Sequence, residues 1–401
     1  MNLKPFYWNF DNLDATFQGC IPQAMVERLE QAKVEATDTR AAVLVEWQGE
    51  AMHVAESGAK GGYAFRCDTG PTGAIWFFSR NQNPKNWNIR VSNHANSLAS
   101  LGLGGVRAEM HRFLSAIGAT VRDASISRVD YCLDFLASDI EAATGDAFML
   151  DPTAFVMHSH TSRADHDDDG GIAMHGVSGR YTSVTCGKMP GRQVILYEKS
   201  REVRQKQKVE WWSHWKAART CQNLPPLGGK ERVWRLELRA GKDHLKDRWG
   251  ITKWGHLDTK IADLYARALA DIRYTIPNIS DSERCRWPDH PLWAAARRTV
   301  DTDLFEMTTG AEPGVIKEVK RKQQQQVLIA QIQGLAAAYS VAADLPADAD
   351  LISEAAAKAI RSHIRNDPDR FEASRQKAGR RCRFIDDEEY GAPNCLDDFV
   401  I

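Results

Sequence analysis

The sequence of 401 residues lacks the features that would place it among membrane-spanning or secreted proteins. No run of about 18 apolar residues occurs, so we expect no membrane-spanning helix. The N-terminal stretch MNLKPFYWNFDNLD has no positively charged start followed by an apolar segment, so we also expect no secretory signal. These two absences predict a cytoplasmic protein with no membrane partner.

Two kinds of cofactor site are also missing from the sequence pattern. The cysteines form no CxxC pair, which predicts reduced thiols rather than a disulfide framework or a zinc site. They are Cys20, Cys67, Cys132, Cys186, Cys221, Cys285, Cys382 and Cys395. The stretch GLGG at 102–105 predicts a turn before a helix, and nothing in the chain resembles a Walker A sequence. We therefore expect no intrinsic helicase.

The formal net charge is only −1, but the charge is unevenly distributed along the chain. Between Gly187 and Trp254 there are 17 lysines and arginines against 7 acids. Acidic stretches at 165–169 and 343–354 compensate for them. A basic window in a neutral chain is typical of a local site for a polyanion such as nucleic acid. A solvated charged helix after Tyr197 would explain part of the same window.

The pattern of apolar residues divides the chain into three parts. Short β-rich stretches at 41–47, 62–68, 74–79 and 86–92 are separated by turn residues, and a helix is predicted over 104–120. Further strands follow within 121–255, and a helical pattern begins at 257. We predict a catalytic and DNA-binding domain over 1–276, an appended helical module over 277–385, and a disordered acidic tail over 386–401.

Three stretches in the middle of the chain each have one polar side, because successive side chains on a strand point to opposite faces of a sheet. In ISRVDYCLDF (126–135) the polar side carries Arg128, Asp130, Cys132 and Asp134. In RVWRLELRA (232–240) it carries Arg235, Glu237 and Arg239. In RQVILYEK (192–199) the corresponding side carries Gln193, Ile195, Tyr197 and Lys199.

We predict an α+β fold in which these strands share one antiparallel sheet, with helices on its apolar face and the active site on its charged face. Two carboxylates on the same face of one strand, with a third on a neighbouring strand, can hold a hard divalent cation. A structural network of ion pairs is the alternative explanation for the same residues.

SRVDYCLDF, RQVILYEKSRE and VWRLELRAGK, in this order, resemble the RxDxxxD … Y.K..E … RxE signature of the replication initiation factor family. The resemblance covers roughly residues 5–275. It implies a fold related to the nicking relaxases and rolling-circle initiators. Members of this family include rolling-circle plasmid initiators, filamentous-phage replication proteins and relaxases of some integrative elements.

The resemblance implies a metal-dependent enzyme that nicks one DNA strand at an origin and later rejoins it. Its nucleophile falls on Tyr197, which would form a 5′-phosphotyrosine and leave a 3′-OH. Lys199, Arg128 and Arg235 would assist catalysis. Mg²⁺ or Mn²⁺ would be held by Asp130, Asp134, Glu202 and Glu237. Because a phenol has an ordinary pKa of about 10, we expect Lys199 and a nearby cation to favour the phenolate of Tyr197.

We expect the cations of the basic window to contact DNA. They are Arg192, Arg201, Arg204, Lys206, Lys208 and Arg239. The implied partners are origin DNA (single-stranded or cruciform at the nick), a host helicase and a DNA polymerase, in the cytoplasm of a bacterial cell. A homodimer is a further option. The appended module is a candidate for recruiting the helicase, with origin recognition and dimerisation equally open.

Other interpretations of the same residues stay open. Tyr181 is the rival nucleophile, whereas Tyr131 and Tyr265 have the spacing of core residues. We interpret His158 and His160 as a pair of loop histidines, and a metal-binding pair is the alternative. The tryptophans of WWSHWKAAR (211–219) would either stack on bases or pack in the core. Two alternative functions also stay open for the whole protein. One is a conjugative relaxase with the same chemistry, and the other is an origin-binding regulator that does not cleave DNA.

Overall fold

The computed structural model describes residues 3–157, 171–278, 280–310, 317–369, 371–372 and 382–385. The chain forms two compact units, Met1–Gly310 and Ala311–Ile401. Within the described ranges, no helix has the length and apolar character needed to cross a membrane.

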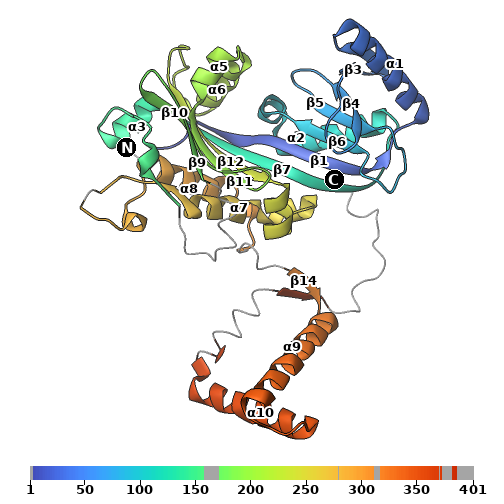
Figure 1. The fold of residues 1–401 in the computed structure, drawn as a ribbon. Coiled ribbons are helices and arrows are strands. Elements are labelled where there is room, and N and C mark those ends of the chain that lie inside the picture. Colours follow the sequence, from blue (N-terminus) through green and yellow to red (C-terminus); the bar gives the residue numbers. More distant parts are fainter. Residues whose placement is uncertain are drawn as a thin grey trace. The chain divides into compact units, whose positions relative to one another are not determined.

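The first unit contains an 11-stranded antiparallel sheet with the strand order β2-β3-β4-β5-β6-β1-β7-β12-β11-β10-β9 (Figure 1). Its strands are β1 (Tyr7–Cys20), β2 (Val43–Trp47), β3 (Glu50–Val54), β4 (Tyr63–Asp68), β5 (Ala74–Ser79), β6 (Ile89–Asn93), β7 (Thr120–Leu136), β9 (Ile172–Val177), β10 (Arg180–Gly187), β11 (Arg192–Glu198) and β12 (Val233–Gly241). A small second sheet pairs β8 (Phe155–Met157) with β13 (Ile272–Tyr274). The predicted α+β class with an antiparallel sheet is confirmed.

The three strands with polar sides are direct neighbours, in the order β7-β12-β11. Their register places Asp134, Arg235 and Tyr197 side by side in one row across the sheet. Residues opposite each other on paired strands point to the same face, so the three polar sides form one continuous face. This face lies opposite the apolar one that carries Val129 and Tyr131.

The sequence pattern did not predict β1, which forms the most extensive strand pairing in the sheet, with β7. β1 pairs with both β6 and β7, and it therefore joins the two halves of the sheet. Its register shifts between Phe10 and Asn12, which leaves Asp11 as an extra residue. Such a bulge interrupts the period of two by which a strand is recognised.

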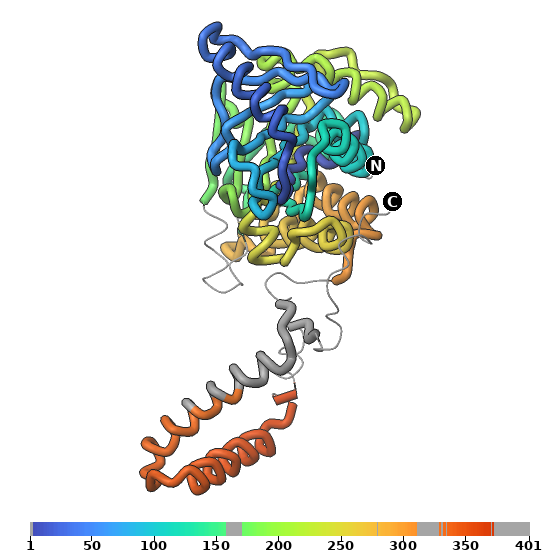
Figure 2. The backbone as a smooth tube through the Cα atoms, turned by 90° about the vertical axis from the view of Figure 1, so that its right-hand side faces the viewer, coloured from blue at the N-terminus to red at the C-terminus, as the bar shows by residue number. Residues whose placement is uncertain are grey.

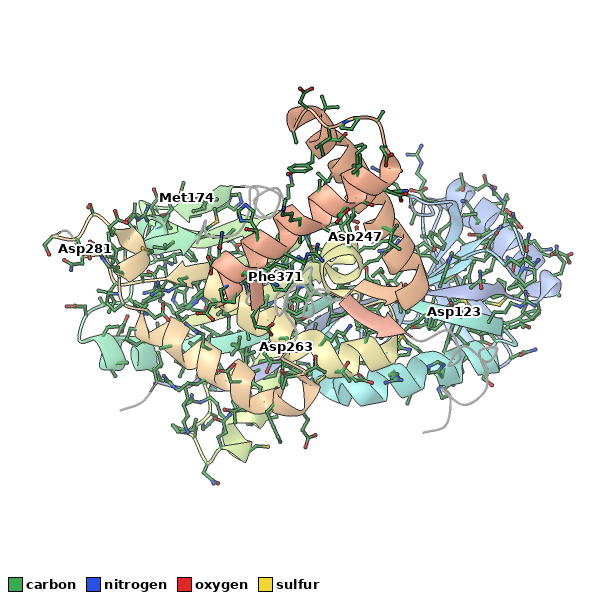
Figure 3. All side chains as sticks on the ribbon, turned by 90° about the horizontal axis from the view of Figure 1, so that it is seen from below. Asp123, Met174, Asp247, Asp263, Asp281 and Phe371 are labelled. Carbon is green, nitrogen blue, oxygen red and sulfur yellow. The ribbon has the colours of Figure 1, made fainter. Side chains whose placement is uncertain are left out.

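Among the described residues, four helices cover the apolar face of the sheet. They are α1 (Gln23–Thr39), α2 (Ala95–Ala116), α7 (Trp254–Asp271) and α8 (Pro291–Asp303). Figure 3 looks onto α7 and α8, with Asp263 labelled on α7. The ring of Phe113 on α2 stacks on Trp76 at 4.5 Å between centroids, and Tyr265 on α7 packs against Tyr131 at 5.7 Å. The helix predicted over 104–120 starts earlier, at Ala95, and bends at Gly102.

Helices also cover one end of the polar face. The predicted arrangement had helices on the apolar face only. The helices on the polar face are α5 (Lys199–Gln205) and α6 (Glu210–Cys221); a short helix, α3 (Ala137–Thr144), follows β7. Trp211 and Trp215, one turn apart on α6, are buried against Tyr7 and Cys132. The two tryptophans form an apolar stripe along α6, and α6 packs over this end of the sheet because that stripe is buried there.

The first compact unit extends beyond the predicted boundary at residue 276, because α8 is part of it. Trp293 of α8 is fully buried, and its Nε1 donates to the carbonyl oxygen of Leu269 at 2.9 Å. Asp303 accepts hydrogen bonds from Tyr131 Oη at 2.6 Å and from Trp8 Nε1 at 2.8 Å. The unit therefore ends at Gly310.

The second unit contains the helices α9 (Arg321–Ala342) and α10 (Ala349–Asn366), and α10 follows the coloured part of α9 in Figure 2. A parallel pair joins β14 (Lys317–Lys320) to β15 (Cys382–Ile385). Among the described side chains of this unit, large apolar residues are exposed on both helices, including Leu335 and Ile360. The predicted acidic tail, 386–401, lies outside the described residues.

Candidate active site

Tyr197 lies near the end of β11 and is half-buried. Its hydroxyl donates a hydrogen bond to Glu237 Oε2 at 3.0 Å, from the neighbouring strand β12. Lys199 Nζ donates to the same hydroxyl oxygen at 3.3 Å. The phenol oxygen is thus held between a carboxylate acceptor and an ammonium donor.

The pKa of Tyr197 is raised well above its ordinary value of 10.0. Burial is the largest cause, and the negative charge of Glu237 adds to it, whereas Arg235 acts in the opposite direction. The expectation that nearby cations favour the phenolate is therefore wrong for this arrangement. Tyr197 is a neutral phenol at neutral pH, and it needs a base if it is to act as a nucleophile.

Lys199 is buried at the start of α5 and is held by several partners. Its Nζ donates to Glu202 Oε2 at 2.8 Å and lies 5.0 Å from the centre of the Trp211 ring. Burial alone would raise the pKa of Glu202, but Lys199 and Lys208 outweigh it, so this pKa lies below its usual range. Glu202 therefore fixes the position of the Lys199 ammonium beside Tyr197.

A second group of charges lies farther along the same face. Asp130 is buried and accepts from Arg128 Nη2 at 2.5 Å. Glu237 accepts from Arg239 Nε at 2.7 Å, and the same Arg239 Nε is 3.8 Å from Asp130. The pKa of Asp130 is raised to about 7. Burial is the largest cause and the negative charge of Glu237 adds to it, whereas Arg128 acts in the opposite direction. Arg128, Asp130, Glu237 and Arg239 thus form one coupled network that reaches Tyr197.

Asp134 and Arg235 form a separate ion pair beneath α6, and both are fully buried. Arg235 donates from Nε and Nη2 to the two Asp134 oxygens, each at 2.7 Å, and from Nη1 to Asp11 at 2.6 Å. Trp215 Nε1 also donates to Asp134 at 2.7 Å. This bidentate geometry satisfies both residues, so they support the sheet and α6 rather than face a ligand.

The four predicted metal ligands do not form one cluster. Asp130 and Asp134 are four residues apart on β7, which separates their Cα atoms by about 13 Å. Asp134 is occupied by Arg235 and Trp215, and Glu202 by Lys199, Lys206 and Lys208. Within the described ranges, no group of three or more His, Cys, Asp or Glu side chains is arranged to hold a metal ion.

Asp130 and Glu237 do lie near each other, and beside Asp130 the buried Oδ1 of Asn12 has no hydrogen-bond partner. Arginines already neutralise both carboxylates, however, so the residues present do not fit a divalent ion as they stand. The dependence on Mg²⁺ or Mn²⁺ stays a prediction of the sequence pattern.

The six predicted DNA-binding cations differ in burial, in the face of the sheet on which they lie and in their ion-pair partners. Arg192 is buried and donates to Asp271 of α7 at 2.9 Å, so it lies on the helix-covered face and cannot contact DNA at the site. Lys206 and Lys208 are drawn to Glu202. Arg204 donates to Ser200 and is 3.6 Å from Glu198, and Arg201 is half-buried on α5. Of the six, Arg239 belongs to the network that reaches Tyr197.

The alternative candidates are placed as follows. Tyr181 is exposed on β10. Tyr131 and Tyr265 are buried, as expected of core residues. Trp211 and Trp215 pack in the core, which excludes them from stacking on bases. His158, His160 and the acidic stretch 165–169 lie outside the described residues.

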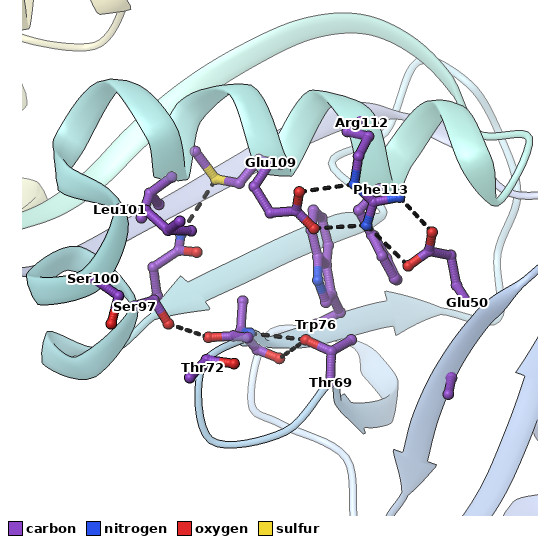
Figure 4. Close-up of a pocket in the computed structure, with 16 residues that line it drawn as sticks. Glu50, Thr69, Thr72, Trp76, Ser97, Ser100, Leu101, Glu109, Arg112 and Phe113 are labelled. Atoms are coloured by element: carbon purple, nitrogen blue, oxygen red, sulfur yellow. Dashed lines mark hydrogen bonds and ion pairs between the residues drawn. The ribbon is translucent and has the colours of Figure 1, made fainter. Parts of the chain in front are cut away.

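A cavity of about 410 Å³ lies on the other face of the sheet, between α2 and strands β3 and β5 (Figure 4). Trp76 and Phe113 line it, and Arg112 closes one side through ion pairs to Glu50 and Glu109. None of the predicted catalytic residues lines this cavity. It is therefore separate from the Tyr197 network.

Sequence reasoning missed several residues that complete the polar face. Asp11, Asn12 and Asp14 come from β1, and Arg90 comes from β6 and donates to Asp14 at 2.9 Å. Alternation in DATFQ would have revealed the second half of β1, with Asp14 on the polar side. Only the register of the sheet brings this residue next to Arg128.

Comparison with known proteins finds similar solved structures. No protein-family model matches the chain, and no curated protein matches it. A solved structure of a rolling circle replication initiator protein from Geobacillus stearothermophilus is similar over 76% of this chain and 98% of that chain. The identity is 12% and the TM-score 0.36. A superposition of this quality does not define a shared fold, so we base the function on this chain's own residues.

Proposed function

We propose that this protein is a tyrosine-dependent DNA nicking and joining enzyme that initiates rolling-circle replication. The observation that carries the proposal is the position of the Tyr197 hydroxyl between Glu237 and Lys199. A tyrosine that serves only for packing needs one hydrogen-bond partner, whereas Tyr197 has an acceptor and a cationic donor on a single oxygen. The three ordered motifs that contain these residues add support.

In the proposed nicking step, Glu237 takes the phenol proton as Tyr197 Oη attacks a phosphorus atom of the DNA backbone. The Oη–P bond forms and the P–O3′ bond breaks, so the product is a 5′-phosphotyrosine and a strand that ends in 3′-OH. The leaving 3′ oxygen takes its proton from Lys199 or from water. Joining is the reverse: a 3′-OH attacks the phosphotyrosine, and the phenol regains its proton.

The cations near Tyr197 support this chemistry with a phosphodiester. Lys199 and Arg239 lie on either side of the Tyr197–Glu237 pair. Fixed cations stabilise the extra negative charge that develops on the phosphate oxygens in the transition state. Because Glu202 and Glu237 already hold these cations in place, they would need little reorganisation when DNA binds.

The experiment that tests the proposal uses a supercoiled plasmid that carries the gene for this protein, with Mg²⁺ or Mn²⁺ present. The wild-type protein should convert it to the open circular form and remain covalently attached to the 5′ end. Tyr197→Phe should keep the fold, because the ring stays, but lose the adduct. Tyr181→Phe is the matched control and should react normally. A full yield of adduct from Tyr197→Phe would move the nucleophile to another residue.

A second candidate function is a DNA-binding regulator that does not cleave. The raised pKa of Tyr197 and the completeness of the ion-pair network favour it, since both are also properties of a structural site. The plasmid experiment separates the two, because a regulator would bind the DNA and leave it supercoiled. A conjugative relaxase would react in the same way at a transfer origin.

The proposal includes partners. A DNA polymerase would extend the 3′-OH left by the nick. No Walker A sequence occurs in the chain, so strand separation would come from a host helicase. The second unit, 311–401, is our candidate for recruiting that helicase, and origin recognition or dimerisation are the other roles open to it.

A further inference from the structure

Three arginines on the polar face share an unusual pattern of exposure. Each is paired with a carboxylate: Arg90 with Asp14, Arg128 with Asp130, and Arg239 with Glu237. The side chains of these arginines are 33%, 29% and 28% exposed, whereas those of their carboxylates are 8%, 1% and 3% exposed. A ligand approaching this face would therefore meet guanidinium groups and not the acids that hold them.

The register of the sheet arranges these arginines along a diagonal that begins at the Tyr197 site. Arg239 lies opposite Asp130, two residues from Arg128, so their Cα atoms are about 8 Å apart. Arg128 lies opposite Asp14 on β1, and Arg90 lies opposite Thr16 on the same strand. This places the Cα atoms of Arg128 and Arg90 about 12 Å apart.

The diagonal ends at an aromatic group on β4 and β5. The guanidinium of Arg90 lies over the Phe77 ring at 5.2 Å, and Tyr63 packs against Phe77 with 6.4 Å between ring centroids. Arg66 is directly opposite Phe77 and half-buried. The helices that pack on this half of the sheet, α1 and α2, contact the opposite face through Phe65 and Trp76.

We infer that this line is the path of a single DNA strand that leads away from the scissile phosphate at Tyr197. Arg239, Arg128 and Arg90 contact phosphates along it, and the ring of Tyr63 offers a surface on which a base stacks. Arginines interleaved with aromatic residues suit single strands, because every base has a face that can stack. The inference rests on the proposed function for its choice of ligand.

The test measures binding of a fluorescein-labelled oligo-dT of about 30 nucleotides by fluorescence anisotropy over a range of salt concentrations. All proteins carry Tyr197→Phe, so that no cleavage takes place. Arg90→Gln should weaken binding several-fold and reduce the slope of log K against log salt by about 0.7, the value for one lost contact to a single strand. Tyr63→Leu should weaken binding with little change in that slope.

Arg80→Gln is the matched control. Arg80 also pairs with one carboxylate, Glu30, but this pair lies with α1, away from the polar face. It should leave both the affinity and the slope unchanged. Because Arg90→Gln leaves Asp14 buried without its cation, Asp14→Asn with Arg90→Gln provides a second variant that keeps the site neutral. This double variant should show the same reduced slope.

The path is overturned if the double variant and Arg80→Gln bind the oligonucleotide alike while the protein without the Tyr197 change nicks its plasmid. The proposed function would then stand without this path. If the protein neither nicks the plasmid nor binds oligo-dT, the proposed function fails first. Equal weakening toward a duplex of the same length would identify the line as a general contact for DNA and would also contradict a single-strand path.

Discussion

Tyr197 Oη donates a hydrogen bond to Glu237 Oε2 on the neighbouring strand, at 3.0 Å, and both side chains point to the polar face of the sheet. In the proposed mechanism this hydrogen bond is the route by which the proton leaves. Glu237→Gln keeps the size of the side chain and an oxygen that can accept, but it removes the base. We expect the rate of adduct formation to fall by about 10²–10⁴, with little change in DNA affinity.

The measurement is single-turnover adduct formation as a function of pH. The pH profiles of the wild type and Glu237→Gln should differ, because only the wild type has a carboxylate at this position that can accept the phenol proton. Removing the negative charge also removes one cause of the raised pKa of Tyr197, so the residual activity of the variant should rise toward high pH. A variant with the rate and pH profile of the wild type would rule out Glu237 as the base.

The sequence pattern was sufficient to predict the charged face, because alternation on β7, β11 and β12 is regular over this region. It was also sufficient to predict the burial of Tyr131 and Tyr265. What it could not supply is the register. Whether Asp134 faces Arg235 or Glu237 depends on a shift of two residues between strands that are about 100 positions apart, and alternation is the same in both cases.

Because alternation does not reveal the register, the sequence pattern placed four carboxylates in one predicted metal site. The same limit applies to α6, whose Trp215 donates to Asp134 from a position that spacing alone does not reveal. The N-terminal part of β1 was not predicted because the bulge at Asp11 breaks the alternation. In each case the information lies in contacts distant in sequence, where local preference has little influence.

Asp134 and Asp130 should respond differently to the same substitution. Asp134→Asn leaves Arg235 fully buried with one of its two carboxylate partners gone, and breaking a buried pair in this way costs about 3–5 kcal/mol. We therefore expect a clear fall in the temperature of thermal unfolding. Replacing both residues, with Asp134→Leu and Arg235→Met, should recover part of that loss. An unchanged unfolding temperature for Asp134→Asn would show that the pair does not support the fold.

Asp130→Asn tests the predicted metal ion. Asp130 lies next to Glu237 in the network that reaches Tyr197, and its pKa is raised to about 7 by burial, so a neutral amide is tolerated more easily there than at Asp134. If the sequence-based prediction is right, nicking should stop in excess EDTA, return with Mn²⁺, and be lost in Asp130→Asn with the fold intact. Nicking at full rate in EDTA would show that Arg128, Arg239 and Lys199 provide all the positive charge that the reaction requires.

His290 should make the docking of α8 sensitive to acid. Its Nδ1 accepts from the backbone N–H of Leu292 at the start of α8, and burial lowers its pKa to about 4. The folded state therefore binds fewer protons than the unfolded state between pH 4 and about 6.5. The stability that this group contributes is present above pH 6.5 and is lost as the pH falls toward 4. The loss is at most about 3 kcal/mol.

Thermal unfolding measured at a series of pH values provides the check. His290→Asn keeps a side chain that can cap α8 but cannot titrate in this range, so its curve should be flatter than that of the wild type between pH 6.5 and 4. Two parallel curves would place the acid sensitivity of the protein in other groups.

Truncation distinguishes the two possible ends of the catalytic unit. A chain of residues 1–310 keeps α8, whose Leu292, Trp293 and Val300 are buried against the rest of the first unit. We expect it to fold, to remain soluble, and to nick DNA like the full chain. A chain that ends at Ser280 loses these contacts and both hydrogen bonds to Asp303, from Trp8 and Tyr131.

Removing a buried tryptophan alone costs about 3–5 kcal/mol, and the whole of α8 buries several more apolar side chains. Because a folded domain is stable by only about 5–15 kcal/mol, the chain ending at Ser280 should be insoluble or unfolded. Circular dichroism and nicking of the plasmid measure both outcomes. A soluble and active 1–280 chain would show that α8 is an accessory helix. An inactive 1–310 chain with native circular dichroism would show instead that the second unit takes part in cleavage itself.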